Sequence, residues 1–153
     1  MRSESRIQIA SSVAQVWAYL CDVERWPEWA PTVRQAWVAD GAPVQPGARV
    51  EQRAKGPIGS SHHRSQEVTA VEAPHLLAFA GPMGTSAARW GMQLEPTDDR
   101  QTEAMMWVEV DRRSVMRAIP SRVLAGRIRR VMDREMAAIK TRVEATAPGG
   151  SDR

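Results

Sequence analysis

The longest regular pattern of hydrophobic and polar residues runs from Ser121 to Ala145. Its apolar residues recur at steps of three and four, which places them on one face of a helix. Pro120 suits the first turn of this helix, and Pro148-Gly149-Gly150 cannot continue it. Such an amphipathic helix is marginal alone, so the rest of the chain should supply a partner surface. The apolar face consists of Leu124, Ile128, Val131, Met132, Met136, Ile139 and Val143.

The first thirty residues predict three short elements. Apolar and polar residues alternate from Ser5 to Ala10, which predicts a strand. A helix should begin after Ser12, because Ser12 and Gln15 have the spacing of a capping box, and it should end near Asp22. The segment from Trp26 to Pro31 is rich in proline and tryptophan, and it suits a second short helix or a tight corner.

The middle of the chain predicts six further strands, separated by glycine, proline and aspartate turns. No crossover helices separate these strands, so they should pair antiparallel, and the fold class should be α+β. The strand at 60–71 is polar throughout, and hydrophobicity does not indicate which of its residues face inward. The six strands are expected at 33–39, 49–54, 60–71, 76–80, 86–95 and 102–111.

The seventh strand has the clearest pair of faces. One face holds only apolar residues, and this face should look inward, because burying unpaired carboxylates costs several kcal/mol. Glu103 and Glu109 should therefore point outward. The inward face consists of Ala104, Met106, Val108 and Val110.

Composition narrows the class of protein. The chain has 153 residues, 42% hydrophobic and 25% charged, which fits one globular domain over residues 1–147 with a disordered tail at 148–153. No apolar run is long enough to span a membrane, and the first residues are not typical of a signal peptide, so we expect a cytoplasmic protein. A single cysteine, Cys21, excludes an intrachain disulfide, and we expect a small buried side chain there.

The positive charge gathers near the C-terminus. Residues 114–145 hold eight Lys and Arg but three Asp and Glu, whereas the whole chain has a formal charge of only +3. A basic helix face can indicate nucleic acid or anionic lipid. This face lacks interleaved aromatic residues and any nucleic-acid motif, so a solvated face is the expected structure and no nucleic-acid partner is predicted.

The order of these first elements resembles the opening of the START-like superfamily, also called SRPBCC. The resemblance rests on a strand, a Ser-capped helix with Val16-Trp17 and Leu20, and then the segment from Asp22 to Trp29. It implies the helix-grip fold, in which a seven-stranded curved antiparallel sheet wraps around a long C-terminal helix. Two short helices after the first strand would close one end of an interior cavity.

Motifs for catalysis are absent from the sequence. It contains no phosphate-binding loop, dinucleotide fingerprint, zinc-protease helix or nucleophile elbow, so catalytic residues stay unknown and no metal or cofactor is predicted. His62 and His63 are adjacent on a strand and point to opposite faces, so they cannot bind one metal together. His63 could contact a ligand, or both imidazoles could lie at the surface.

Six tryptophans, against one Phe and one Tyr, are unusual and suit the wall of a cavity. Plain core packing is the alternative for each, and Trp17 and Trp26 are expected to be structural. In the polyketide aromatase/cyclases of the superfamily, a tryptophan near the position of Trp90 lines the pocket. The predicted ligand-contacting residues are Trp29, Trp37, Arg53, His63, Trp90, Met92, Met106, Leu124 and Ile128, with Trp107 and Arg64 as further candidates.

One acidic residue departs from the pattern of the long helix. Glu135 falls within the apolar arc, close to Val131 and Ile139. A carboxylate in that position should be paired or functional. Both a salt bridge to a nearby arginine and a contact with a ligand stay open.

Three functions are consistent with these observations. The leading hypothesis, implied by the resemblance, is that the protein binds or transports a small hydrophobic molecule, such as a lipid, an isoprenoid or a polyketide-like compound. The second is a polyketide aromatase/cyclase, in which cavity shape and a few polar groups would favour one ring closure. The third is an interaction protein with a filled interior. A homodimer is possible in each case.

Overall fold

The seven strands of the computed structural model form one curved antiparallel sheet, in the order β1-β7-β6-β5-β4-β3-β2. The structure describes residues 1–83, 86–111 and 118–146, so the predicted tail at 148–153 lies outside the described residues. The predicted α+β helix-grip fold is confirmed. The strands are β1 (Arg2–Ile9), β2 (Val33–Val38), β3 (Arg49–Lys55), β4 (Ser61–Glu72), β5 (Leu76–Met83), β6 (Ser86–Asp98) and β7 (Gln101–Val110).

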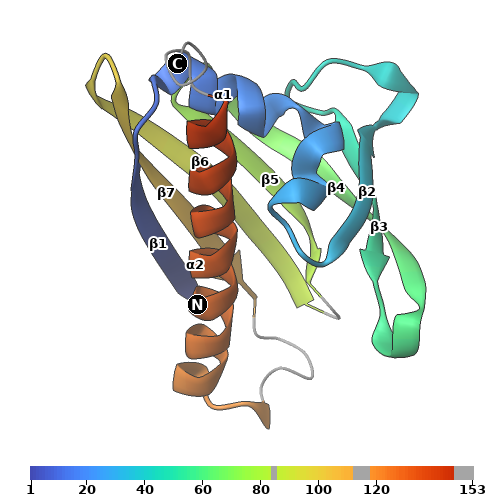
Figure 1. Ribbon diagram of the computed structural model, residues 1–153. Coiled ribbons are helices and arrows are strands. Elements are labelled where there is room, and N and C mark those ends of the chain that lie inside the picture. The colour runs from blue at the N-terminus through green and yellow to red at the C-terminus, as the bar shows by residue number, and fades with distance from the viewer. Residues whose placement is uncertain (84–85, 112–117, 147–153) are drawn as a thin grey trace.

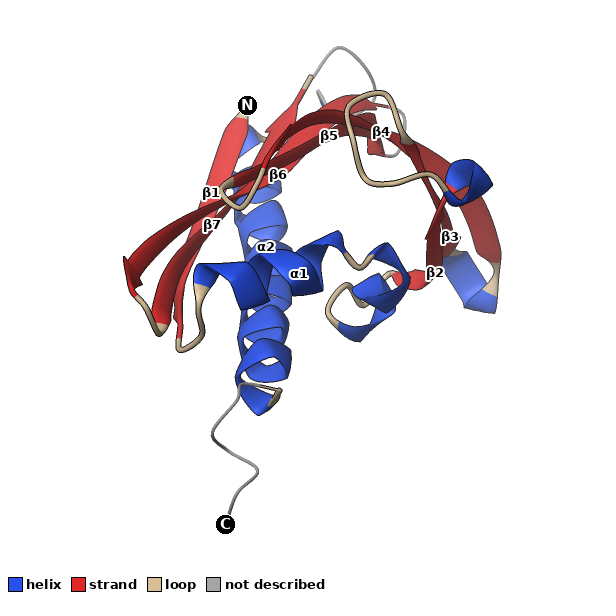
Figure 2. Cartoon of the chain, turned by 90° about the horizontal axis from the view of Figure 1, so that it is seen from above, coloured by secondary structure: helices blue, strands red, loops and turns tan. Residues whose placement is uncertain are grey.

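The long helix α2 (Ser121–Ala145) crosses the concave face of this sheet, as Figure 1 and Figure 2 show. Helix α1 (Val13–Cys21) and the 3-10 helix η1 (Val23–Glu28) follow β1 and cover one end of the concave side. Two further 3-10 turns, η2 (Ala39–Gly41) and η3 (Pro57–Gly59), lie in the connections on either side of β3.

The start of α1 is fixed by a side-chain cap. Ser12 has extended backbone angles, and its hydroxyl accepts a hydrogen bond from the backbone N–H of Gln15 at 3.3 Å. This contact satisfies one of the N–H groups that the first turn leaves unpaired. The side chain of Gln15 does not complete the predicted capping box, because it accepts from the hydroxyl of Ser11 at 2.6 Å instead.

Helix α2 is bound to one edge of the sheet by polar contacts. Ser5 of β1 donates to the Asp133 carboxylate at 2.5 Å. Lys140 donates to the backbone carbonyl of Gln8 at 2.7 Å, and the backbone N–H of Ala10 donates to Glu144 at 2.9 Å. These three hydrogen bonds all join α2 to β1 and the residue that follows it, so the helix is attached along the β1 side of the sheet.

The two faces of β7 follow the predicted alternation. Met106 and Val108 pair with Met92 and Trp90 across the ladder, and their side chains lie on the concave side. On the convex side, Trp107 covers Gly91 so closely that a Cβ there would lie 2.7 Å from the indole ring. The inward residues Ala104, Met106, Val108 and Val110 are all buried, as expected from their lack of polar atoms.

Candidate functional site

An interior cavity of about 340 Å³ lies between the concave face of the sheet, the residues around η1 and helix α2. This volume is at the lower end of the range of small-molecule sites, which is about 300–1,000 Å³. Residues from β3, β4, β6 and β7 line it on the sheet side, and Ile128, Val131, Met132 and Glu135 line it on the helix side.

One wall of the cavity is apolar. Met106 and Val108 of β7 lie beside Ala88 of β6, and Trp26 and Trp29 contribute rings from the η1 end. An aromatic cluster stiffens this wall, because stacked and edge-on ring pairs add to the free energy of simple burial. The cluster is formed by Phe79 stacked on Trp90 at 4.4 Å between centroids, with Trp26 edge-on to both at 5.2 and 5.5 Å.

The opposite wall, from β3 and β4, is polar. Arg64 donates through Nε to the amide oxygen of Gln52 at 2.6 Å, and the indole N–H of Trp90 donates to Gln66 at 2.9 Å. Gln52 and Gln66 are themselves buried and within 3.5 Å of each other. Each amide is therefore held in place, and together they fix the half-buried Arg64 side chain at the cavity.

Glu135 faces this wall from α2. No hydrogen bond or ion pair within 4.0 Å is formed by its carboxyl group among the described residues, although Arg64 is close enough to act on it electrostatically. Burial raises the pKa of Glu135 to about 7, and the positive charge of Arg64 only partly opposes this rise. None of the arginines among the described residues therefore forms the salt bridge considered for Glu135, and this carboxyl group exchanges a proton near neutral pH.

The amino-acid sequence matches a family model over residues 1–144, described as polyketide cyclase / dehydrase and lipid transport. The chain belongs to this family. A comparison with curated protein sequences gave no significant match.

Solved structures agree with this family fold. A START superfamily protein from Mycobacterium smegmatis has a TM-score of 0.75 at 15% identity, and covers 94% of this chain and 97% of its own. A conserved protein from Geobacillus kaustophilus has a TM-score of 0.74 at 17% identity, with coverage of 95% and 97%. The di-domain aromatase/cyclase StfQ of the steffimycin pathway has a TM-score of 0.68 at 17% identity, with coverage of 95% of this chain and 50% of that one.

The structure of this family member brings together four of the nine predicted ligand-contacting residues. Trp29, Trp90, Met106 and Ile128 line the cavity. Met92 and Leu124 are buried but are not among the lining residues.

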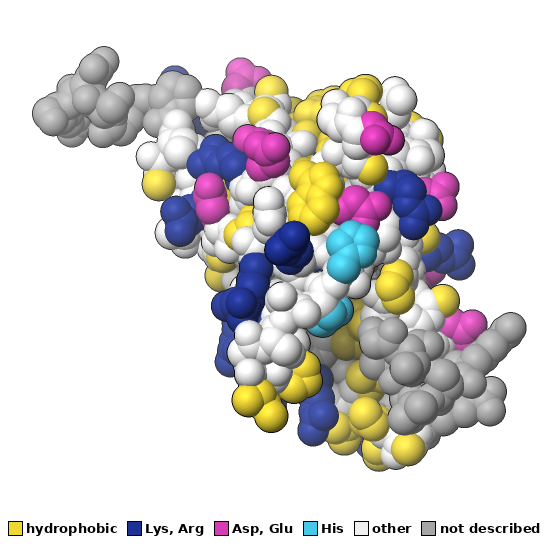
Figure 3. All heavy atoms as spheres, turned by 90° about the vertical axis from the view of Figure 1, so that its right-hand side faces the viewer, with side chains coloured by type: hydrophobic (Ala, Val, Ile, Leu, Met, Phe, Trp, Pro, Cys, Tyr) yellow, Lys and Arg dark blue, Asp and Glu magenta, His cyan; other side chains and the backbone are white. Residues whose placement is uncertain are grey.

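Trp37, Arg53 and His63 do not line the cavity, which corrects their assignment to the ligand wall. Arg53 is next to the buried Gln52 on β3, so its side chain points to the opposite, convex face. Trp37 pairs with Glu51 and His63 pairs with Arg53, so both point to the same convex face. His63 contacts Glu51 there at 2.7 Å and lies 6.2 Å from the ring of Trp37. Figure 3 shows this side of the molecule, where hydrophobic, basic, acidic and histidine side chains lie next to one another.

Trp26, Gln52 and Gln66 are lining residues that sequence reasoning missed. Trp26 was assigned a structural role, and its indole N–H does donate to the carbonyl of Leu20 at 3.0 Å, but its ring also faces the cavity. The two glutamines were invisible to hydrophobicity. The alternation of Val50, Gln52 and Ala54 along β3 could have indicated that Gln52 faces inward.

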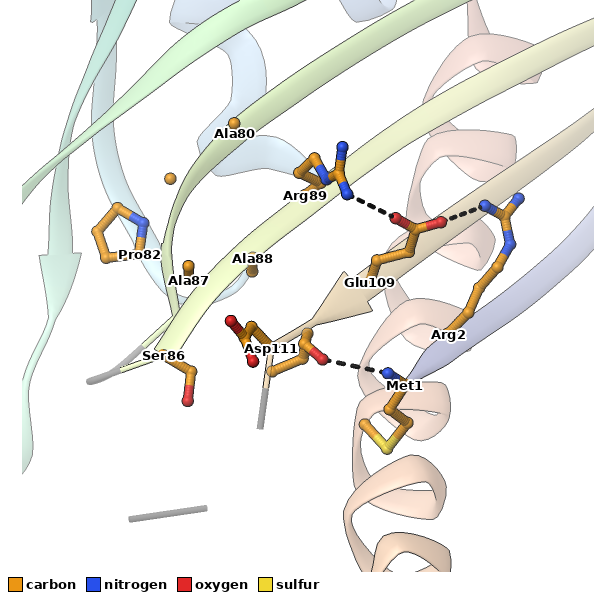
Figure 4. Close-up of a pocket in the computed structure, with 12 residues that line it drawn as sticks. Met1, Arg2, Ala80, Pro82, Ser86, Ala87, Ala88, Arg89, Glu109 and Asp111 are labelled. Carbon is orange, nitrogen blue, oxygen red and sulfur yellow. Dashed lines mark hydrogen bonds and ion pairs between the residues drawn. The ribbon is translucent and has the colours of Figure 1, made fainter. Parts of the chain in front are cut away.

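A larger hollow of about 910 Å³ lies where the ends of β5, β6 and β7 meet the N-terminus. Figure 4 shows that three of its charged side chains are engaged with one another: Glu109 contacts Arg2 at 2.8 Å and Arg89 at 3.7 Å. Its other lining residues include Ala80, Pro82 and Ala87, and none of the lining residues is aromatic. We place the functional site in the smaller cavity, because only that cavity combines enclosing aromatic rings with oriented polar groups.

Two features are absent from the described residues. No helix among them is long and apolar enough to span a membrane. No group of three or more His, Cys, Asp and Glu side chains in the described part of the chain is arranged to hold a metal ion.

Cys21, which is partly buried, has its thiol pKa raised to about 11 by burial.

Proposed function

We propose that this protein binds a small, mainly hydrophobic molecule that carries a polar group, and that it does so in the cavity under α2. The observation that supports this most is the pairing of an aromatic wall with a fixed polar wall in one partly open cavity. The family description, which includes lipid transport, is consistent with such a ligand.

The two walls would contribute different parts of the binding free energy. Apolar surface removed from water stabilises a complex by about 25 cal/mol per Å², so the tryptophan and methionine side chains would supply affinity. Arg64 and the two glutamines would supply orientation, because their hydrogen bonds to one another hold them in place before a ligand arrives.

Native mass spectrometry of the purified protein tests this proposal directly, by detecting a small molecule that co-purifies. Tryptophan fluorescence gives a second test, with Trp90→Phe as the cavity variant and Trp107→Phe as the matched control on the convex face. We expect apolar probes to change the emission of the wild type and of the Trp107 variant, and to change that of the Trp90 variant less, because two of the three lining tryptophans, Trp26 and Trp29, then remain. Unchanged emission of the wild type with every probe would contradict the proposal and favour an interaction protein.

Ring-closure or dehydration chemistry on a polyketide-like substrate is the second candidate, and Glu135 is the observation that favours it. A carboxyl group with a pKa of about 7 can both give and accept a proton at neutral pH. Arg64 would stabilise negative charge that develops on a substrate oxygen. With a poly-β-ketone substrate, a fall in turnover of two or more orders of magnitude in Glu135→Gln would identify an enzyme.

A further inference from the structure

Two ionisable groups enter the cavity from facing walls. Arg64 projects from β4 and Glu135 from α2, and each is the charge that most affects the other. They stop short of an ion pair, since no nitrogen–oxygen distance within 4.0 Å joins Glu135 to any described cation. Space for a third group therefore remains in the cavity that separates their two walls.

Of these two groups, only Arg64 has a hydrogen-bond partner among the described residues, and that partner is neutral. Its Nε donates to Gln52, an amide that orients the guanidinium without balancing its charge. Burial lowers the pKa of Arg64 below its usual value, but arginine stays charged at every physiological pH. A half-buried cation without a permanent anion loses part of its hydration, so one negative charge beside it, from Glu135 or from a ligand, is favourable.

We propose that the cavity selects an amphipathic carboxylate, whose head group takes the place of the Glu135 charge beside Arg64 while Glu135 accepts a proton from solvent. The inference rests on the proposed function and adds the chemical class of the ligand. The apolar body lies against Trp90 and Met106. One carboxylate enters and one proton is taken up, so the charge inside the cavity is the same before and after binding.

The protonation behaviour of Glu135 supports this exchange. Its pKa of about 7 means that a proton is gained at small cost near neutral pH, and a second anion nearby raises that pKa further. The proton therefore goes to Glu135 and not to the bound carboxylate, whose negative charge is stabilised by Arg64.

The other charged or titratable groups near the cavity are more exposed than Arg64 and Glu135. Arg127, on α2 itself, lines the cavity but is solvent-exposed, so water and salt weaken its attraction for an anion. His62 has the concave parity of β4, next to Ala54, but is exposed and is not a lining residue. The lining residues that η1, β6 and β7 contribute have no ionisable side chain.

Isothermal titration calorimetry with decanoate and decan-1-ol tests the exchange, because the two probes differ only in the head group. Decanoate is ionised throughout pH 6–8.5, since free carboxyl groups titrate near about 4. We expect its affinity to fall by at least about tenfold from pH 6 to pH 8.5, as Glu135 loses its proton. In buffers of different ionisation enthalpy at pH 8, the heats should show uptake of close to one proton.

Two cavity variants and one control separate Glu135 and Arg64 from other groups. Glu135→Gln mimics the protonated side chain, so it should bind decanoate equally at both pH values and without proton uptake. Arg64→Met should lose decanoate but retain decanol. Glu103→Gln, the same change on the convex face, should behave like the wild type. Thermal unfolding of each variant confirms that it is folded before titration.

The outcomes distinguish the inference from the function on which it rests. If decanol and decanoate both bind and the affinity for decanoate is independent of pH, the exchange is wrong while ligand binding stands. A pH dependence that persists in Glu135→Gln would also overturn it, and would point to His62. If neither probe binds at any pH, the proposed function fails for this ligand class and the exchange fails with it.

Discussion

The two strands that face each other across the cavity, β7 and β4, differ in how they encode their inward face. On β7, every inward residue from Ala104 to Val110 is apolar and the glutamates point outward. On β4, Arg64 and Gln66 point inward, and polar residues occupy the outer face as well. Burial alone therefore specifies the first wall, whereas hydrogen bonds between neighbouring strands specify the second.

The apolar wall should determine how tightly a ligand binds, and the polar wall should determine which head group is preferred. The β7 wall has no group that can recognise a particular head group, and its methionine is flexible enough to adapt to varied shapes. The β4 wall offers fixed donors and acceptors, and α2 adds a carboxyl group whose charge changes near neutral pH. Substitutions on each wall should consequently affect different measurements.

The largest effect is expected on the apolar wall. Met106→Trp should strongly weaken binding of hydrophobic probes, because the larger and more rigid indole ring would narrow the 340 Å³ cavity. Met106→Leu, which is close in volume, should retain binding within about tenfold. Titration with a fluorescent apolar probe measures both. Binding by the tryptophan variant at wild-type affinity would place the ligand elsewhere.

Glu135 should make the free energy of unfolding depend on pH. The folded state holds its proton more tightly than the unfolded chain, with a pKa of about 7 against 4.5. Its stabilising contribution is therefore complete below pH 4.5 and is lost as pH rises through about 7. We expect the difference in unfolding free energy between wild type and Glu135→Gln to change by on the order of 3 kcal/mol across this range. Parallel denaturant curves at all pH values would contradict a raised pKa.

Removing one acceptor from the polar wall should have a moderate cost. Gln66→Leu leaves the indole N–H of Trp90 without its acceptor, which should destabilise the fold by about 1–2 kcal/mol. Gln93→Leu is the matched change at an exposed position of β6, and it should stay within about 0.5 kcal/mol of the wild type. Denaturant unfolding compares the two, and equal stabilities would mean that the hydrogen bond contributes nothing.

The smallest effect is expected outside both walls. His63→Ala should change ligand affinity by less than about tenfold, or 1.4 kcal/mol, since His63 contacts Glu51 on the convex face. Calorimetric titration of the variant at pH 7 measures this. A loss beyond tenfold would be incompatible with the position of His63 outside the cavity.

Sequence patterns predicted the elements that hydrophobicity determines. The long helix at 121–145, the Ser12 cap and the inward face of β7 all follow from regular spacing of apolar residues or from local capping chemistry. The family resemblance over residues 7–31 then indicated how these elements are arranged, and the family match over residues 1–144 agrees with it.

The polar half of the site was not accessible in the same way. Register between β3 and β4 decides whether His63 or Arg64 faces inward, and a one-residue shift would exchange them. A strand that is polar on both faces gives no signal of this register. Glu135 stood out from its helix, but whether it reaches Arg64 depends on how far α2 lies from β4, which only the folded chain defines.

The attachment of α2 along β1 has a consequence for which molecules can be exchanged. The three polar contacts from Asp133, Lys140 and Glu144 all lie on that side, so they anchor one margin of the helix, while apolar side chains such as Ile128 and Val131 border the space on the other. We expect a slight roll of the helix about its anchored margin to widen this space while those contacts stay in place. The protein should therefore discriminate weakly between ligands of different chain length, so that affinity changes little along a homologous series. A change of head group should alter the affinity much more.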